Sequence, residues 1–172
     1  MPACPLATVL YRFDDAARFS VFESHTTAKG PVSVQTERDD TGDFLRIGYE
    51  RTEADAPEFI IVLALPLAAV DGRPRQLLLD VFGDASGCHL HLEGMGAEDV
   101  LLALSFGAVD FEGWRTLRAD ASKSVPPLQF HRLRIIAAPW LVALRLGLRS
   151  HSLTGPVRLV PPGVLNSPSR VR

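Results

Sequence analysis

Cysteine is scarce in this sequence, and its scarcity limits the kinds of fold and site that the chain can form. The 172 residues include two cysteines, Cys4 and Cys88, which lie far apart in the chain. Two distant cysteines cannot build a disulfide framework or the paired spacing of a zinc motif. Two free thiols are the simplest interpretation, and a single bridge between them is the alternative.

The sequence also lacks a long apolar run and an excess of positive charge. Its longest apolar stretch, Ile60 to Val70, is interrupted by Pro66 and is too short to span a bilayer. The first ten residues lack the basic start of a secretory leader. We therefore expect no membrane segment and a cytoplasmic location by default, with secretion after removal of a leader as the alternative. A formal net charge of −2 gives no reason to expect nucleic-acid binding, which needs clustered positive charge.

What the sequence does contain is a succession of short apolar runs separated by turn residues. Val32 to Glu37 and Phe44 to Arg51 alternate apolar and polar residues, which is the pattern of half-buried strands. The turn residues between them indicate a β-hairpin. Phe59 to Leu65 is continuously apolar, and Pro66 is expected to end that strand. Further strands are expected at Leu77–Phe82, Cys88–Glu93, Val100–Phe106, Trp114–Arg118, Gln129–Ala138 and Thr154–Val160.

Two segments along this series are less regular than the strands. Gly83 to Gly87 is expected to be a tight turn after which Cys88–Glu93 pairs back on Leu77–Phe82. Leu141 to Arg149 fits either a helix or a strand, and Pro139 and Gly147 favour the strand.

About nine to eleven short strands at such spacing predict an all-β protein, an antiparallel β-sandwich. Residues 1–160 are expected to form one domain, followed by a C-terminal tail over residues 161–172.

Several stretches resemble the galactose-binding-domain-like jelly rolls, the β-sandwiches of many carbohydrate-binding modules, including those appended to bacterial glycosidases. They are Asp71-Gly72-Arg73-Pro74, the Leu77–Gly87 strand and turn, the Val109–Arg115 corner, Phe13-Asp14-Asp15 and Thr154-Gly155-Pro156-Val157. The resemblance implies a jelly-roll sandwich, a carbohydrate ligand and no catalysis. It also implies a structural calcium, for which Asp14, Asp15 or Glu23 would supply ligands. The last strand lacks the acid that such modules carry there.

The candidate ligand site starts from one expected strand. His89, His91 and Glu93 alternate with leucines, so their side chains are expected on one face. We expect Asp80 on the neighbouring strand and the same face. Carboxylate, imidazole and guanidinium groups suit sugar hydroxyls, and an aromatic ring can stack on a sugar's apolar face. The predicted site comprises Arg46, Asp80, His89, His91, Glu93, Arg115 and Trp140.

Simpler interpretations stand beside this site. A solvated outer sheet face produces the same alternation. The His-x-His pair could also hold zinc, although no third ligand follows at a recognisable spacing. Trp114 and Tyr49 are expected in the core, and Trp140 is the better candidate for an exposed stacking ring.

Catalysis has little support in the sequence. Ser86 lacks the spacing of a nucleophile elbow, and the adjacent Cys88 and His89 would point to opposite faces of a strand. The sequence thus predicts a non-catalytic binding module for carbohydrate. The alternative is a structural or protein-interaction sandwich that forms a homo-oligomer or holds a protein partner. This alternative depends on whether Leu141–Leu148 is an exposed apolar strand, which a partner would cover.

Overall fold

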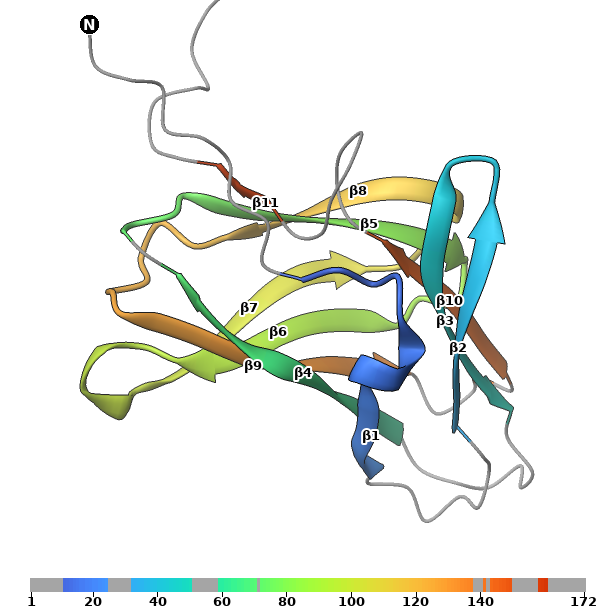
Figure 1. Ribbon diagram of the computed structural model, residues 1–172, viewed down its shortest axis with the longest axis horizontal. Helices are drawn as coiled ribbons and strands as arrows, with labels where there is room; N and C mark the ends of the chain where they lie inside the picture. The colour runs from blue at the N-terminus through green and yellow to red at the C-terminus, as the bar shows by residue number, and fades with distance from the viewer. Residues whose placement is uncertain are drawn as a thin grey trace, which may run out of the picture.

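The computed structural model describes residues 11–24, 32–50, 59–70, 72–137, 141, 143–149 and 158–160. These residues form eleven strands in two antiparallel sheets that pack face to face (Figure 1). The five-stranded sheet has the order β1 (Ser20–Ser24), β4 (Phe59–Val70), β9 (Leu128–Ala137), β6 (His89–Met95), β7 (Leu101–Ala108). This architecture confirms the antiparallel β-sandwich that the sequence predicts.

The six-stranded sheet is arranged around β5 (Gln76–Asp84). β8 (Glu112–Asp120) pairs with one edge of β5 along its whole length. The other edge is shared, because β10 (Ala143–Arg149) pairs with one half and β11 (Arg158–Val160) with the other. β3 (Gly42–Glu50) then pairs with β10, and β2 (Val32–Asp39) pairs with β3 as the expected hairpin.

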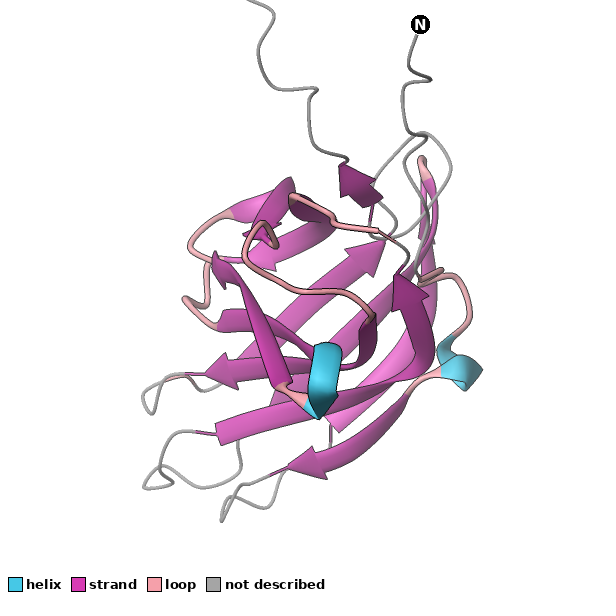
Figure 2. Cartoon of the chain, turned by 90° about the vertical axis from the view of Figure 1, so that its left-hand side faces the viewer, coloured by secondary structure: helices cyan, strands magenta, loops and turns pink. Residues whose placement is uncertain are grey.

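Helical structure is limited to two single turns in the described part of the chain. These are the 3₁₀ helices η1 (Ala16–Arg18) and η2 (Ala97–Asp99), drawn in cyan in Figure 2. Neither they nor any other described segment forms a helix long and apolar enough to cross a membrane.

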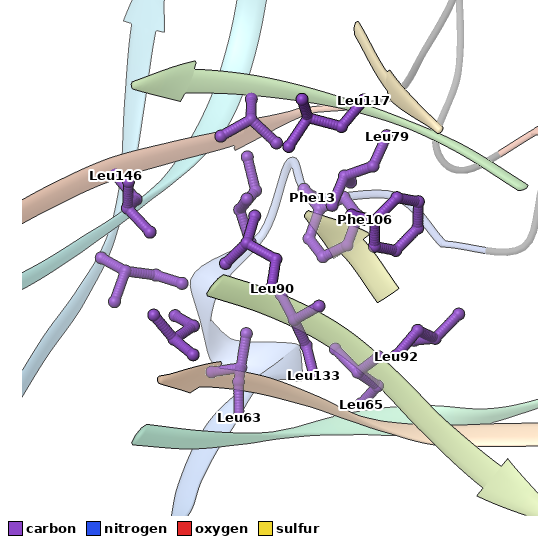
Figure 3. Close-up of a cluster of buried hydrophobic side chains, with 14 of the residues drawn as sticks. Phe13, Leu63, Leu65, Leu79, Leu90, Leu92, Phe106, Leu117, Leu133 and Leu146 are labelled. Carbon is purple, nitrogen blue, oxygen red and sulfur yellow. The ribbon is translucent and has the colours of Figure 1, made fainter. Parts of the chain in front are cut away.

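The core lies between the sheets, where alternate side chains of both inner faces meet (Figure 3). Leu63, Leu90 and Leu133 come from the five-stranded sheet, and Leu79 and Leu146 from the six-stranded one. Each of these leucines is at most 1% exposed. Burial of this apolar surface is the main force that holds the two sheets together.

The segment before η1 also belongs to the core. Phe13 is 2% exposed, and Tyr11 donates its hydroxyl to the backbone oxygen of Phe130 at 2.6 Å. Burial raises the pKa of Tyr11 above its ordinary value, so the hydroxyl stays protonated and remains a donor. Tyr49 is 4% exposed, as expected for a core residue.

Pro66 does not end its strand, contrary to the sequence-based expectation. β4 continues to Val70, and its pairing with β9 shifts register between Ala64 and Ala68. The irregularity spans Pro66, so the strand can resume beyond the residue that has no N–H to donate.

The Gly83–Gly87 segment does not close a hairpin either. β5 lies in the six-stranded sheet and β6 in the five-stranded one, so the segment carries the chain from one sheet to the other. Its backbone is bonded to the segment between β7 and β8 rather than to a hairpin partner. Ala85 N–H donates to the carbonyl of Phe111 at 2.8 Å, and Gly87 N–H donates to that of Val109 at 2.9 Å. The prediction that Cys88–Glu93 pairs back on Leu77–Phe82 was wrong.

Leu141–Arg149 contains a strand, β10, but that strand is not exposed. β10 lies between β3 and β5, and Leu144, Leu146 and Leu148 are each 0% exposed. The strand preference is confirmed, whereas the exposed apolar surface that suggested self-association is absent from β10. The homo-oligomer stays a prediction without that support.

Cys88 gives a direct test of core packing. It is a free thiol with 0% exposure, and burial raises its pKa to about 11. We expect it to resist labelling by Ellman's reagent near neutral pH in the folded protein, because the reaction needs an accessible thiolate. A Cys4→Ser background isolates its signal, and unfolding in guanidinium chloride should restore full labelling. Rapid labelling of the folded protein would contradict this packing.

Candidate functional site

The outward face of the six-stranded sheet carries aromatic side chains, which is unusual for a surface in contact with water. Residues paired directly across antiparallel strands share a face of the sheet. One such row joins Trp114 on β8, Phe82 on β5, Gly147 on β10 and Arg46 on β3. Together with Phe44 on β3, these residues define what we call the aromatic face.

The Trp114 ring packs against two phenylalanine rings on the aromatic face. The Trp114 ring lies 5.4 Å from Phe44 and 5.5 Å from Phe82, centroid to centroid, in T-shaped contacts. Gly147 makes room for them, because an added Cβ would come within 2.9 Å of the Phe82 Cβ and 3.2 Å of the Phe44 ring. Phe82 remains 36% exposed, so part of its ring is open to a ligand.

The indole of Trp114 is held in place by polar contacts as well. Its Nε1–H donates to Asp39 Oδ2 at 2.9 Å, and the Arg149 guanidinium lies 3.9 Å from the ring centroid. The hydroxyl and N–H of Thr41, with help from Trp114 and Arg149, keep the pKa of Asp39 below its ordinary value although burial opposes this. Asp39 is therefore ionised, as a strong acceptor should be.

Trp114 was expected in the core, and that expectation was wrong. Its side chain is half-buried on the outward side of β8, because it pairs with Phe82 rather than with a core residue. On β8 it is Leu117 that points into the core, where it pairs with Leu79.

Charged pairs line the aromatic face. Arg46 Nη1 lies 3.2 Å from Glu37 Oε2, and Arg149 Nε lies 3.9 Å from Asp80 Oδ2. Thr116 donates its hydroxyl to Asp80 Oδ1 at 2.5 Å. These contacts fix the directions of planar groups that can each offer two parallel hydrogen bonds to a ligand.

The residues of the predicted ligand site do not form one site. Arg46 and Asp80 lie on the aromatic face, whereas His89, His91 and Glu93 lie on the outward face of the five-stranded sheet. Asp80 was expected beside the histidines, and this was wrong because β5 and β6 belong to different sheets.

The remaining predicted residues lie elsewhere. Arg115 pairs with Val81, so it is on the opposite side of the sheet from Trp114, and its guanidinium lies 4.2 Å from the Phe111 ring centroid. Arg115 Nη1 lies 3.8 Å from Asp110 Oδ1. Trp140 lies outside the described residues. Arg115 and Trp140 therefore remain predictions as ligand residues.

Asp14 and Asp15 were expected to supply calcium ligands. Asp15 Oδ1 accepts the N–H of Ala17 at 3.0 Å and caps η1, while Asp14 is exposed. Among the described residues, no group of three or more His, Cys, Asp or Glu side chains could hold a metal ion. A calcium site needs more oxygen ligands than these two acids provide, so the calcium ion stays a prediction. Among the described residues there is likewise no third ligand that could bind zinc together with His89 and His91.

The sequence held a signal for the aromatic face that the prediction missed. Phe82 lies in the polar phase of its strand, with Asp80 and Asp84, and Phe44 is out of phase with the buried Leu45. An aromatic residue in the outward phase of a strand is a candidate contact residue.

Comparisons with known proteins agree on the fold. No family model and no curated protein matches the sequence. Among solved structures, the family 11 carbohydrate-binding module of the cellulosomal cellulase Lic26A-Cel5E of Clostridium thermocellum is 10% identical, with a TM-score of 0.54 over 90% of this chain and 94% of that one. The family 11 module from the same organism in complex with a β-1,3-1,4-mixed-linked tetrasaccharide is 12% identical, with a TM-score of 0.51 over 90% and 95%.

A third similar structure is that of TmCBM27, a carbohydrate-binding module described for specific mannan recognition. It is 7% identical, with a TM-score of 0.51 over 90% of this chain and 96% of that one. At such identities the similarity shows the fold alone. The chain therefore has the two-sheet β-sandwich fold of carbohydrate-binding modules, as its sequence motifs indicated.

Proposed function

We propose that this protein is a non-catalytic carbohydrate-binding module and that its glycan lies on the aromatic face. One observation carries the proposal: the exposed ring of Phe82 and the half-buried ring of Trp114 adjoin guanidinium–carboxylate pairs on the outward face of one sheet. Sugars present an apolar ring face and a rim of hydroxyls, so they need these two kinds of group side by side. The similar modules that hold a tetrasaccharide and recognise mannan support the same class of ligand.

The charges on the aromatic face favour an uncharged glycan. Arg46 is paired with Glu37, and Arg149 lies near both Asp39 and Asp80, so each guanidinium already has a carboxylate. Such pairs can donate to and accept from neutral hydroxyls without an unpaired charge being buried. Because the contacts among these side chains exist before a ligand arrives, little further ordering is needed for binding.

A binding role suits the acids of the aromatic face better than catalysis. Asp39 has its pKa lowered by Thr41, Trp114 and Arg149, whereas a general acid needs a raised one. Asp80 accepts from Thr116 and lies near Arg149, so it is engaged in holding neighbouring side chains.

Phe82→Ala tests the proposal with little disturbance of the core, since the ring is 36% exposed. A glycan array on the wild-type protein first identifies the ligand, and calorimetry then compares affinities. We expect at least about a tenfold weaker affinity for the variant, because truncation of an aromatic contact residue often costs more than 1 kcal/mol.

Leu101→Ala is the matched control, because Leu101 is an apolar residue on the other sheet that is 82% exposed. Its affinity for the glycan should equal that of the wild type. The proposal fails if no glycan on the array binds, or if the Phe82 variant binds as well as the control.

A further inference from the structure

The outward face of the five-stranded sheet contains a row of hydrogen-bond donors that the glycan proposal does not use. His91 on β6 is paired directly with Ser105 on β7 and with Arg134 on β9. The leucines that flank His91 are at most 1% exposed, so these three side chains point away from the core. We call Ser105, His91 and Arg134 the donor row.

Each member of the donor row has a hydrogen to offer. Ser105 Oγ accepts the N–H of Gly107 at 3.2 Å, which leaves its own hydrogen free to turn outward. Arg134 Nη1 lies 3.0 Å from Glu93 Oε1, while Arg134 Nε is buried with no hydrogen-bond partner among the described residues. An imidazole always carries at least one N–H. Adjacent strands lie about 4.8 Å apart, so one small acceptor can reach two of these groups at once.

The three strands that carry the donor row contain more arginines than carboxylates. Glu93 is the only carboxylate in the three strands β6, β7 and β9, all of which the structure describes, and it is already paired with Arg134. The same strands carry Arg132, paired across from Glu93, together with His89 beside His91. Within these three strands a negatively charged ligand is therefore favoured over a positively charged one.

On the β7 side, the surroundings of the donor row leave space for a small group. Ala103 and Ala108 on β7 lie on the same face, opposite Glu93 and His89, and their short side chains do not cover the row. The strands β6, β7 and β9 place no Phe, Tyr or Trp side chain next to His91 on this side, so they offer a sugar ring less to stack on than the aromatic face does.

We propose that the donor row binds an oxyanion, a sulfate or carboxylate group, either free or carried by an acidic saccharide. The group accepts hydrogen bonds from Ser105, His91 and Arg134 and competes with Glu93 for the guanidinium. This site is on the opposite outer surface from the aromatic face and does not depend on the glycan proposal.

The binding should strengthen as pH falls. Burial, followed by the neighbouring His89, lowers the pKa of His91 below its ordinary value, with Arg134 acting in the same direction and Glu93 against it. His91 is therefore neutral near neutral pH and gains charge in mildly acidic solution. A bound anion favours the charged form, so saturation of the site should raise the pKa of His91.

The test is a titration of the full chain with sodium sulfate at about pH 6, with sodium chloride at matched ionic strength as the reference. The histidine ring signals are followed by NMR. We expect a saturable shift of His91 that chloride does not produce, and weaker binding at about pH 8. Galactose 6-sulfate and glucuronate, compared with galactose and glucose, decide whether the anion is free or sugar-borne: tighter binding of the acidic sugars assigns the site to a saccharide.

Two variants act in opposite directions. Arg134→Gln should weaken sulfate binding at least about tenfold, because it removes a charge-assisted donor. Glu93→Gln should strengthen binding, because it removes the competing carboxylate. Arg38→Gln is the control, since Arg38 is an arginine in the other sheet that is likewise paired with a carboxylate, Asp43 at 2.8 Å.

The proposal is overturned if sulfate and the acidic sugars shift His91 no more than chloride does, or if Glu93→Gln weakens binding. It is also overturned if Arg134→Gln and Arg38→Gln bind sulfate equally well. Phe82→Ala should leave the sulfate titration unchanged, so failure of the glycan proposal can be told apart from failure of this one.

Discussion

Replacing Trp114 by alanine should abolish glycan binding and lower the free energy of unfolding by about 2–4 kcal/mol. The change removes the ring contacts to Phe44 and Phe82 and the indole N–H donated to Asp39. It also removes the ring that Arg149 covers. Urea denaturation gives the loss of stability, and calorimetry with the glycan found on the array gives the loss of affinity.

Trp114→Phe separates the two contributions of the indole. It keeps an aromatic ring against Phe44 and Phe82 but leaves Asp39 without the N–H donor at 2.9 Å. We expect a cost of about 1 kcal/mol and partial retention of binding. If the alanine variant binds glycan like the wild type, the aromatic face is not the ligand site, whatever its effect on stability.

Among additions of a single methyl group to the described core, Gly94→Ala should be the most destabilising. We expect it to lower the free energy of unfolding by about 3 kcal/mol or more. Gly94 is buried on β6 where it meets β9, and an added Cβ would lie 2.0 Å from the backbone oxygen of Gln129. A backbone atom within a sheet cannot move aside as a flexible side chain can, so the two strands must separate. Thermal and urea unfolding would measure the loss.

Gly96→Ala is the matched control two residues further along. There the nearest atom to an added Cβ is the Val125 oxygen at 3.5 Å, an ordinary contact, and the backbone is extended. Its stability should change by less than about 1 kcal/mol. Equal stability of the two alanine variants would mean that β6 and β9 are not as close as the structure shows.

The strands themselves were predictable because their cause is local. Alternation in Val32–Glu37 and Phe44–Arg51 predicts the β2–β3 hairpin, and Gly147 with Pro139 favours β10 over a helix. Pro66 misled the prediction, because a register shift in β4 passes over it. A proline limits one position of a strand ladder, and whether the strand resumes depends on the partner strand.

The candidate site was harder to predict, and Asp80 shows why. Its alternation with Leu79 and Val81 correctly indicates that it points away from the core. The same argument applies to His91, and both residues do point outward, but from different sheets. The pattern of one strand fixes which side of its own sheet a side chain takes and carries no information on which sheet the strand joins.

The sequence by itself determined an all-β chain of short strands, its buried leucines and the resemblance to carbohydrate-binding modules. These follow from side-chain alternation and turn residues, which act over a few positions. Only the tertiary structure decided that β5 pairs with β8 and β10 rather than with β6. This pairing brings Trp114, Phe82 and Arg149 together and leaves the donor row on the opposite surface. The reason is that strand pairing depends on contacts between distant segments and on the closing of a shared core, which no local pattern specifies.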